Sequence, residues 1–236
     1  LGLLFDSRFR LRIYLAIMVI ALILTRSRMG NIAFFLAMAL AGTIALYAGR
    51  RFSFRLVALL GSLFLVDMLL LGRWFGFDRL LTRLVEVAPG EELRVWSNAN
   101  TLEYISQFLL TGSGGGSFYG IYPNFQAEEN GIFHVHAHND YLEFAAELGL
   151  PATVLLLAVP LLALLSACRV QRDRHTPLYR GTAFAVTMTL AWAALHSAVD
   201  FNRQIPANAL TFLVIMALAF VCRGLPGRKA SDRQPR

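Results

Sequence analysis

The stretch LGLPATVLLLAVPLLALLSAC, residues 148–168, contains no charged side chain and is long enough to cross the hydrocarbon core of a membrane as one helix. The rest of the chain follows the same plan, since 56% of its 236 residues are hydrophobic, only 16% are charged, and the charges cluster between apolar runs. A soluble domain spreads its charges along the chain, and a disordered one lacks this apolar content. The sequence therefore predicts an integral membrane protein.

Five more apolar runs accompany this one, so we expect an all-α membrane fold with about six transmembrane helices. The six runs cover roughly residues 11–25, 31–49, 56–72, 148–168, 182–199 and 207–222. The first run is short for a hydrocarbon core of about 30 Å, and it needs flanking arginines to snorkel toward the membrane surface. We expect the whole chain, 1–236, to form a single membrane domain.

The loop charges predict how the helices are oriented. Fifteen of the 22 basic residues fall on the loops that share a side with the chain termini, whereas most acidic residues fall on the other side. The positive-inside rule places the basic side in the cytoplasm, so both termini of this chain should be cytoplasmic. The net charge of +7 then belongs to cytoplasmic loops, and we expect no nucleic-acid partner.

The large loop over residues 73–141 should lie outside, in the periplasm of a Gram-negative bacterium, and is the loop long enough to build a site. Apolar and aromatic residues at helical spacing predict a helix over about 91–110. A GSGGGS turn at 112–117 follows, with aromatic residues after it. We therefore expect a periplasmic loop that contains short helices.

Three histidines and two carboxylates stand together just before the 148–168 span: His134, His136, His138, Asp140 and Glu143. A histidine can take a proton near neutral pH, so one placed beside a hydroxyl could act as a general base. The alternative is a solvated polar loop at the end of a span, which is common in membrane proteins.

Metal binding is a second reading of the same histidines. On an extended strand His134, His136 and His138 would share one face and could converge on an ion. The outer loop holds no cysteine and no further histidine cluster to complete the ligand shell. We expect no metal.

Of the seven basic residues on the outer side, three are candidates for a site: Arg26, Arg28 and Arg94. The positive-inside bias argues against Arg26 and Arg28 on that side. The guanidinium fork binds phosphate through two hydrogen bonds, so these residues could hold an anionic ligand. The alternatives are snorkelling at the interface for Arg26 and Arg28, and an ion pair with a nearby glutamate for Arg94.

His196 and Asp200 form a pair four residues apart at the outer end of the fifth span, followed by Asn202 and Arg203. They could face the same site as His138. A structural pair between neighbouring spans explains them equally well.

Taken together, these stretches resemble the O-antigen ligase and polymerase family of bacterial membrane glycosyltransferases. LTRSRMG at 24–30 is similar to a family segment at the outer end of a span, and Arg94 to Trp96 followed by 112–118 resembles the outer-loop arginine and glycine-rich run. The family pattern of His, then Asn, Ser or Gln, nine residues and Gly fits His138, Asn139 and Gly149. Ala152 departs from the Gly, Thr or Tyr that ends the pattern in ligases.

The resemblance implies transfer of a glycan from an undecaprenyl-pyrophosphate carrier to a hydroxyl acceptor at the periplasmic face of the inner membrane. His138 would orient or deprotonate the acceptor, while Arg28 and Arg94 would hold the pyrophosphate. The resemblance implies no metal and no cofactor. Second-rank candidates for the site are Arg26, Asn139, Asp140, His196 and Asp200.

The resemblance leaves several readings open. The acceptor could be a lipid A core, a growing polysaccharide or a protein, so the chain could be a ligase or a polymerase. A non-catalytic partner in polysaccharide export and a transporter are the rival classes. Family members have about twice as many spans, and the chain begins at Leu1, so we expect it to be the C-terminal part of a larger protein.

Overall fold

The computed structural model describes residues 7–25, 27–49, 58, 61–62, 89–126 and 135–226. Within these ranges every regular element is a helix, which confirms the expected all-α class. The elements are α2 (Ser7–Leu24), α3 (Arg28–Gly49), α6 (Pro89–Gln107), α7 (Phe118–Ile121), the 3-10 helix η1 (Tyr122–Phe125), α8 (Asp140–Asp173), α9 (Pro177–His196) and α10 (Pro206–Gly224).

Three described helices are long and apolar enough to cross a membrane: Met29–Ala48 within α3, Asp140–Asp173 and Pro206–Gly224. Six spans are therefore not shown among the described residues. Helices α2 and α9 occupy two of the other predicted runs, but α2 begins among arginines and α9 carries a series of threonines. The predicted run at 56–72 lies outside the described residues, apart from 58, 61 and 62.

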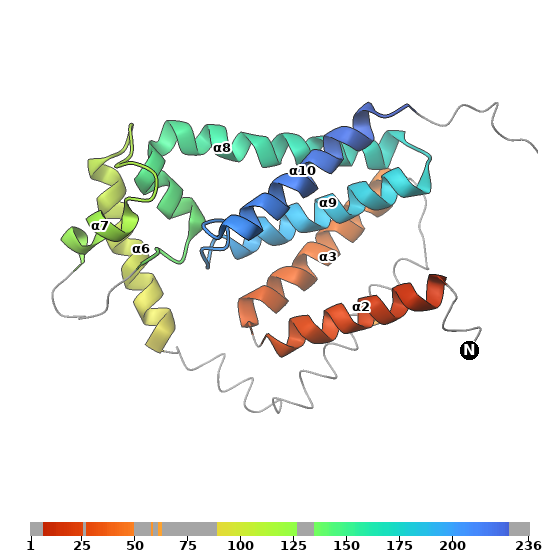
Figure 1. The fold of residues 1–236 in the computed structure, drawn as a ribbon, viewed down its shortest axis with the longest axis horizontal. Helices are drawn as coiled ribbons and strands as arrows, with labels where there is room; N and C mark the ends of the chain where they lie inside the picture. Colours follow the sequence, from red (N-terminus) through yellow and green to blue (C-terminus); the bar gives the residue numbers. More distant parts are fainter. Residues whose placement is uncertain are drawn as a thin grey trace, which may run out of the picture.

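Helices α3, α8, α9 and α10 pack together as a bundle, and α2 lies against α3 (Figure 1). Most residues at the centre of the α8–α9–α10 contact are small, including Ala163, Ala167, Ala183 and Ala219, all with no exposed surface. Small side chains let helix backbones approach closely, which is how membrane helices gain packing energy without a hydrophobic driving force. The large apolar side chains of the bundle, such as Leu155 at 72% exposure, point outward.

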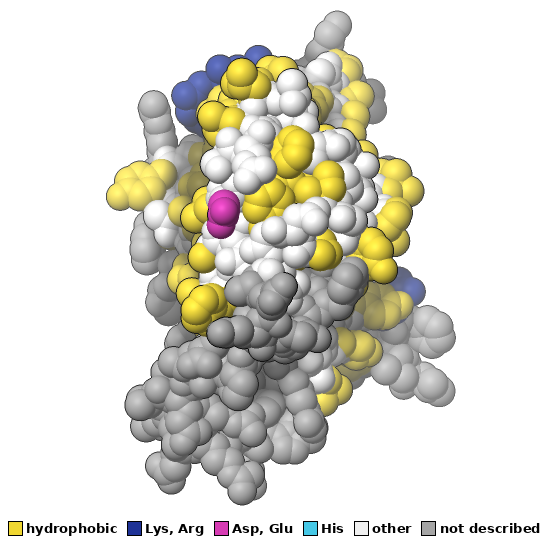
Figure 2. All heavy atoms as spheres, turned by 90° about the vertical axis from the view of Figure 1, so that its left-hand side faces the viewer, with side chains coloured by type: hydrophobic (Ala, Val, Ile, Leu, Met, Phe, Trp, Pro, Cys, Tyr) yellow, Lys and Arg dark blue, Asp and Glu magenta, His cyan; other side chains and the backbone are white. Residues whose placement is uncertain are grey.

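Helices α6 and α7 form a cap on the first segment of α8, and this cap is built around aromatic rings. Tyr104 stacks on Phe125 with ring centroids 5.0 Å apart, and Phe118 stacks on Tyr122 at 4.7 Å. The helix predicted over 91–110 is confirmed as α6, Pro89–Gln107. Figure 2 looks onto this end of the molecule and shows patches of hydrophobic side chains among backbone and other side chains.

Helix α8 bends sharply at Gly149, whose φ of 76° and ψ of 162° are not helical. Pro151 has no N–H to donate to Glu147, and the N–H of Leu150 donates to the carbonyl of Leu109 instead (2.9 Å). The bend thus frees two carbonyls of α8. They accept hydrogen bonds from the glycine-rich run, Ala146 from Ser113 (3.1 Å) and Glu147 from Gly114 (2.8 Å).

Two glycines make this junction possible. A Cβ on Gly149 would stand 2.4 Å from the carbonyl oxygen of Leu110, and one on Gly112 would stand 2.2 Å from that of Glu147. Both residues also have left-handed φ values, 76° and 66°, which glycine adopts without strain. The glycine-rich run therefore closes the kink of α8 and holds the first segment of that helix beneath the cap.

One end of the bundle gathers the described helix termini that the loop charges predict to be outside. The starts of α3, α8 and α10 and the end of α9 lie toward the left of Figure 1, on the same side as α6 and α7. Sidedness with respect to a membrane stays a prediction.

Candidate functional site

His138 lies in the short loop that leads into α8, and its backbone is unusual. Its φ of 52° is left-handed, and no other non-glycine residue among those described shares this feature. The next residue, Asn139, returns to an extended conformation and caps α8: its side-chain oxygen accepts hydrogen bonds from the N–H groups of Tyr141 (3.1 Å) and Leu142 (3.3 Å). Because the N-cap of α8 directly follows His138, the start of the helix fixes the backbone position of this histidine.

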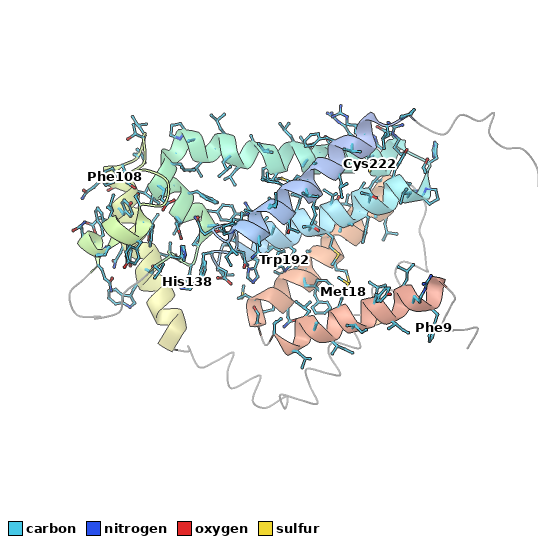
Figure 3. All side chains as sticks on the ribbon, in the orientation of Figure 1. Phe9, Met18, Phe108, His138, Trp192 and Cys222 are labelled. Atoms are coloured by element: carbon cyan, nitrogen blue, oxygen red, sulfur yellow. The ribbon has the colours of Figure 1, made fainter. Side chains whose placement is uncertain are left out.

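The ring of His138 faces the loop between α9 and α10. Its Nδ1 lies 3.9 Å from Oδ1 of Asp200, and each side chain is about a third exposed, 34% and 33%. Phe201 meets the ring edge-on, with centroids 5.0 Å apart. In Figure 3 His138 lies between the cap and the nearer end of the bundle.

His196, the last residue of α9, approaches the same carboxylate from the other side. Its Nδ1 lies 3.9 Å from Oδ2 of Asp200, while its side chain is only 7% exposed. The amide of Asn202 hydrogen-bonds Nδ1 of His196, and the ring of Trp192 stacks on it at 5.1 Å. The structure therefore brings together three of the candidate residues, His138, Asp200 and His196.

Arg28 is the first residue of α3, and the first turn of that helix adjoins His196. Trp192 Nε1 donates to the carbonyl of Gly30 (3.4 Å), and a Cβ on Gly30 would stand 3.5 Å from Nε2 of His196. The backbone at Arg28 is thus close to the site. The side chain of Arg28 and the whole of Arg26 lie outside the described part of the chain.

Arg94 belongs to α6, and its side chain also lies outside the described residues. The helix contacts the first segment of α8 through Tyr104 and Ile105. Arg94 is ten residues earlier, about 15 Å along the helix axis at 1.5 Å per residue. The place of Arg94 in the site therefore stays a prediction.

Three buried carboxylates follow one another on the same face of the first segment of α8. Asp140, Glu143 and Glu147 are 0%, 1% and 5% exposed, and their spacing of three and four residues places them in one row. Asp140 was a candidate from sequence, Glu143 was noted only as part of the histidine cluster, and Glu147 was missed. Helical spacing of acidic residues just ahead of an apolar span is the signal that could have found the row.

Each carboxylate of this row holds a different segment through backbone N–H groups. Asp140 accepts from Arg203 at 3.3 Å, and its own N–H donates to Ser197 (2.9 Å), so it holds the loop that carries Asp200. Glu143 accepts from Ala137 (2.9 Å) in the histidine loop. Glu147 accepts from Phe118 (3.0 Å) at the end of the glycine-rich run.

The histidines of the loop have different partners rather than a common centre. Nδ1 of His136 donates to Glu143 at 2.7 Å, whereas His138 faces Asp200. Within the described ranges, no three His, Cys, Asp or Glu side chains gather as metal ligands would. His134 lies outside those ranges.

A cavity of about 210 Å³ lies between the outer halves of α9 and α10, next to His196. The guanidinium of Arg203 sits over the ring of Phe212 at 4.8 Å and near that of Tyr141 at 5.8 Å. The main residues around the cavity are Trp192, His196, Asn202, Arg203, Asn208 and Phe212.

Helices of membrane-spanning length and composition, with a cluster of polar candidate residues at one end of the bundle, define the class: an all-α protein with membrane-spanning helices. The chain belongs to the O-antigen ligase family, whose model matches residues 13–157. Membership points to glycan transfer of the ligase or polymerase type and to the bacterial inner membrane. A search of curated proteins found no similar sequence.

The matched region runs from α2 through the kink of α8 and ends before α9 and α10. His138, Asn139 and Gly149 therefore lie within it, whereas His196 and Asp200 do not. The family pattern has a structural explanation here, because Asn139 caps the segment that Gly149 ends.

Proposed function

We propose that this protein transfers a glycan from an undecaprenyl-pyrophosphate carrier to a hydroxyl acceptor at the periplasmic face of the inner membrane, with His138 as the general base. The observation that carries the proposal is the placement of His138. This residue matches the histidine of the family's motif, its backbone has a left-handed φ of 52°, and its ring faces Asp200. Uncommon backbone conformations of this kind concentrate at functional sites.

The chemistry requires a base and a stabilised leaving group. The acceptor oxygen attacks the anomeric carbon, the bond from that carbon to the pyrophosphate oxygen breaks, and the hydroxyl proton passes to His138. Asp200 orients the ring through Nδ1, so we assign Nε2 to the acceptor. At 3.9 Å the Nδ1 to Oδ1 contact is longer than a hydrogen bond, and such contacts tighten when substrate binds.

Arginines suit the leaving group because they neutralise a diphosphate in bidentate fashion. We assign the pyrophosphate to Arg28, at the start of α3 beside His196, together with Arg94 on the strength of the family resemblance. Arg26 is the neighbouring second-rank candidate. The scheme uses no metal and no cofactor.

The experiment is a gel profile of surface glycans in a strain that lacks the full-length gene and carries wild type, His138→Ala or His175→Ala. His175 is an exposed histidine in the turn between α8 and α9, at the opposite end of the bundle, and serves as the matched control. We expect wild type and His175→Ala to restore the glycan, and His138→Ala to lose it at equal membrane abundance.

The phenotype of the deletion separates the two reactions of the family. Unattached lipid-linked polymer that wild type converts identifies a ligase, whereas single repeat units in place of long chains identify a polymerase. Full restoration by His138→Ala contradicts the proposed role of the histidine. It favours the rival class of non-catalytic partner, whereas no change on deletion contradicts the proposed transfer itself.

A further inference from the structure

We propose that Glu143 is a positioning residue for His138: its buried carboxylate holds the backbone of Ala137 and the ring of His136, and thereby fixes the loop from which His138 acts. This inference rests on the proposed function for the role of His138.

Both oxygens of Glu143 are used by the histidine loop. Oε2 accepts from the N–H of Ala137 (2.9 Å), the residue that precedes His138, and Oε1 accepts from Nδ1 of His136 (2.7 Å). The side chain is 1% exposed, so water does not compete for these hydrogen bonds. A buried carboxylate with two such partners is a strong anchor for a short loop.

Glu143 also acts on His138 indirectly, through the rings of His136 and Phe201. His136, turned by its hydrogen bond to Glu143, stacks face to face on Phe201 with centroids 4.3 Å apart and planes 15° apart. The same Phe201 meets His138 edge-on at 5.0 Å. A shift of the His136 ring therefore moves the surface against which the His138 ring rests.

The backbone of His138 needs such support. A φ of 52° is uncommon for a residue with a Cβ, and it persists only where the surroundings determine it on both sides. Glu143 holds Ala137 on one side, and the Asn139 cap holds the start of α8 on the other. Removing the Glu143 carboxylate removes one of the two contacts that constrain the backbone of His138.

Glu147 is a matched comparison within the same helix. It is also buried, at 5% exposure, and also accepts a backbone N–H from a loop, that of Phe118 at 3.0 Å. Phe118 and Ala137 pack in the same cluster, so the two glutamates differ in which backbone N–H they hold: Glu147 holds Phe118 of the cap, and Glu143 holds Ala137 of the histidine loop. If the two glutamates act only on stability, their removal should have the same effect on transfer.

The test uses the full-length protein in proteoliposomes, with lipid-linked glycan as donor, and compares Glu143→Ala, Glu143→Gln and Glu147→Ala. We expect Glu143→Ala to lower kcat about 100-fold with the donor KM within about twofold of wild type, because small displacements of a reacting group cost this much. Glutamine still accepts from Ala137, so Glu143→Gln should recover to within about tenfold of wild type. Glu147→Ala should stay within about fivefold per folded molecule.

Hydrogen exchange at Ala137 supplies a readout that needs no activity. We expect the amide to exchange faster in Glu143→Ala than in wild type, and to change little in Glu147→Ala. Unchanged exchange in Glu143→Ala overturns the inference, as does a kcat within about twofold of wild type or an equal loss in the two alanine variants. If wild type transfers no glycan, the proposed function fails instead, and the exchange result still decides whether Glu143 holds the loop.

Discussion

The bundle and the cap of this protein differ in the size of the side chains that they bury. Where α8, α9 and α10 meet, the buried side chains are mainly alanine and valine, and the helices approach one another closely. In the cap the buried side chains are large rings, and its irregular backbone is satisfied by the kink of α8 and by buried carboxylates. The difference shows that regular helices need only fit together, whereas a loop beside a membrane must find a partner for each buried polar group.

The candidate site lies at the junction of the cap and the bundle. His138 belongs to the loop beneath the cap, and His196 and Asp200 belong to the end of the bundle. The kink of α8 at Gly149 joins the cap to the bundle. Substitutions at the kink should therefore disturb both the cap and the bundle, whereas substitutions within one of them should disturb only that one.

The largest effect is expected at the kink. Gly149→Val places a branched side chain at a φ of 76° and 2.4 Å from a backbone oxygen, so we expect a loss of about 3 kcal/mol or more in stability. The measurement is the temperature at which the detergent-solubilised protein loses its monodisperse peak. Gly181→Ala in α9 is the control, because no described atom lies within 4 Å of that Cβ; an equal drop there would contradict the explanation.

An intermediate effect is expected in the bundle. Ala167 has no exposed surface, so Ala167→Leu should force α8 away from its neighbours at a cost of about 1–3 kcal/mol. Leu155→Ala, at a residue 72% exposed on the same helix, should change stability by less than about 0.5 kcal/mol. The same thermal assay ranks the two variants, and the reverse order would mean that the outward face of α8 is a packing surface.

The smallest effect is expected at the cap of α8. Asn139→Ala removes the acceptor for the N–H groups of Tyr141 and Leu142 and should cost about 1 kcal/mol. Asn139→Ser retains a capping oxygen and should stay close to wild type. Equal stability of the alanine and serine variants would show that the helix start is held by its other contacts, such as Asp140 with Ser197.

Several features could be predicted from the sequence because they depend on local pattern. The apolar runs predict helices, the spacing of Trp96 and Tyr104 predicts α6, and the family resemblance draws attention to His138. Three of the six expected spans are found among the described helices, and the number six stays a prediction. A count of apolar residues could not show that threonines and Trp192 of α9 pack inside the described bundle or line a cavity.

What the sequence by itself determined is the helical class, the apolar spans and the polar segment that carries His138 and Asn139, because hydrophobic length and helix caps are properties of neighbouring residues. Tertiary structure alone decided that Asp200 stands between two histidines, that Glu143 grips the loop before His138, and that the glycine-rich run closes the kink of α8. These contacts join segments many residues apart, and their geometry follows from how the helices pack and where α8 bends.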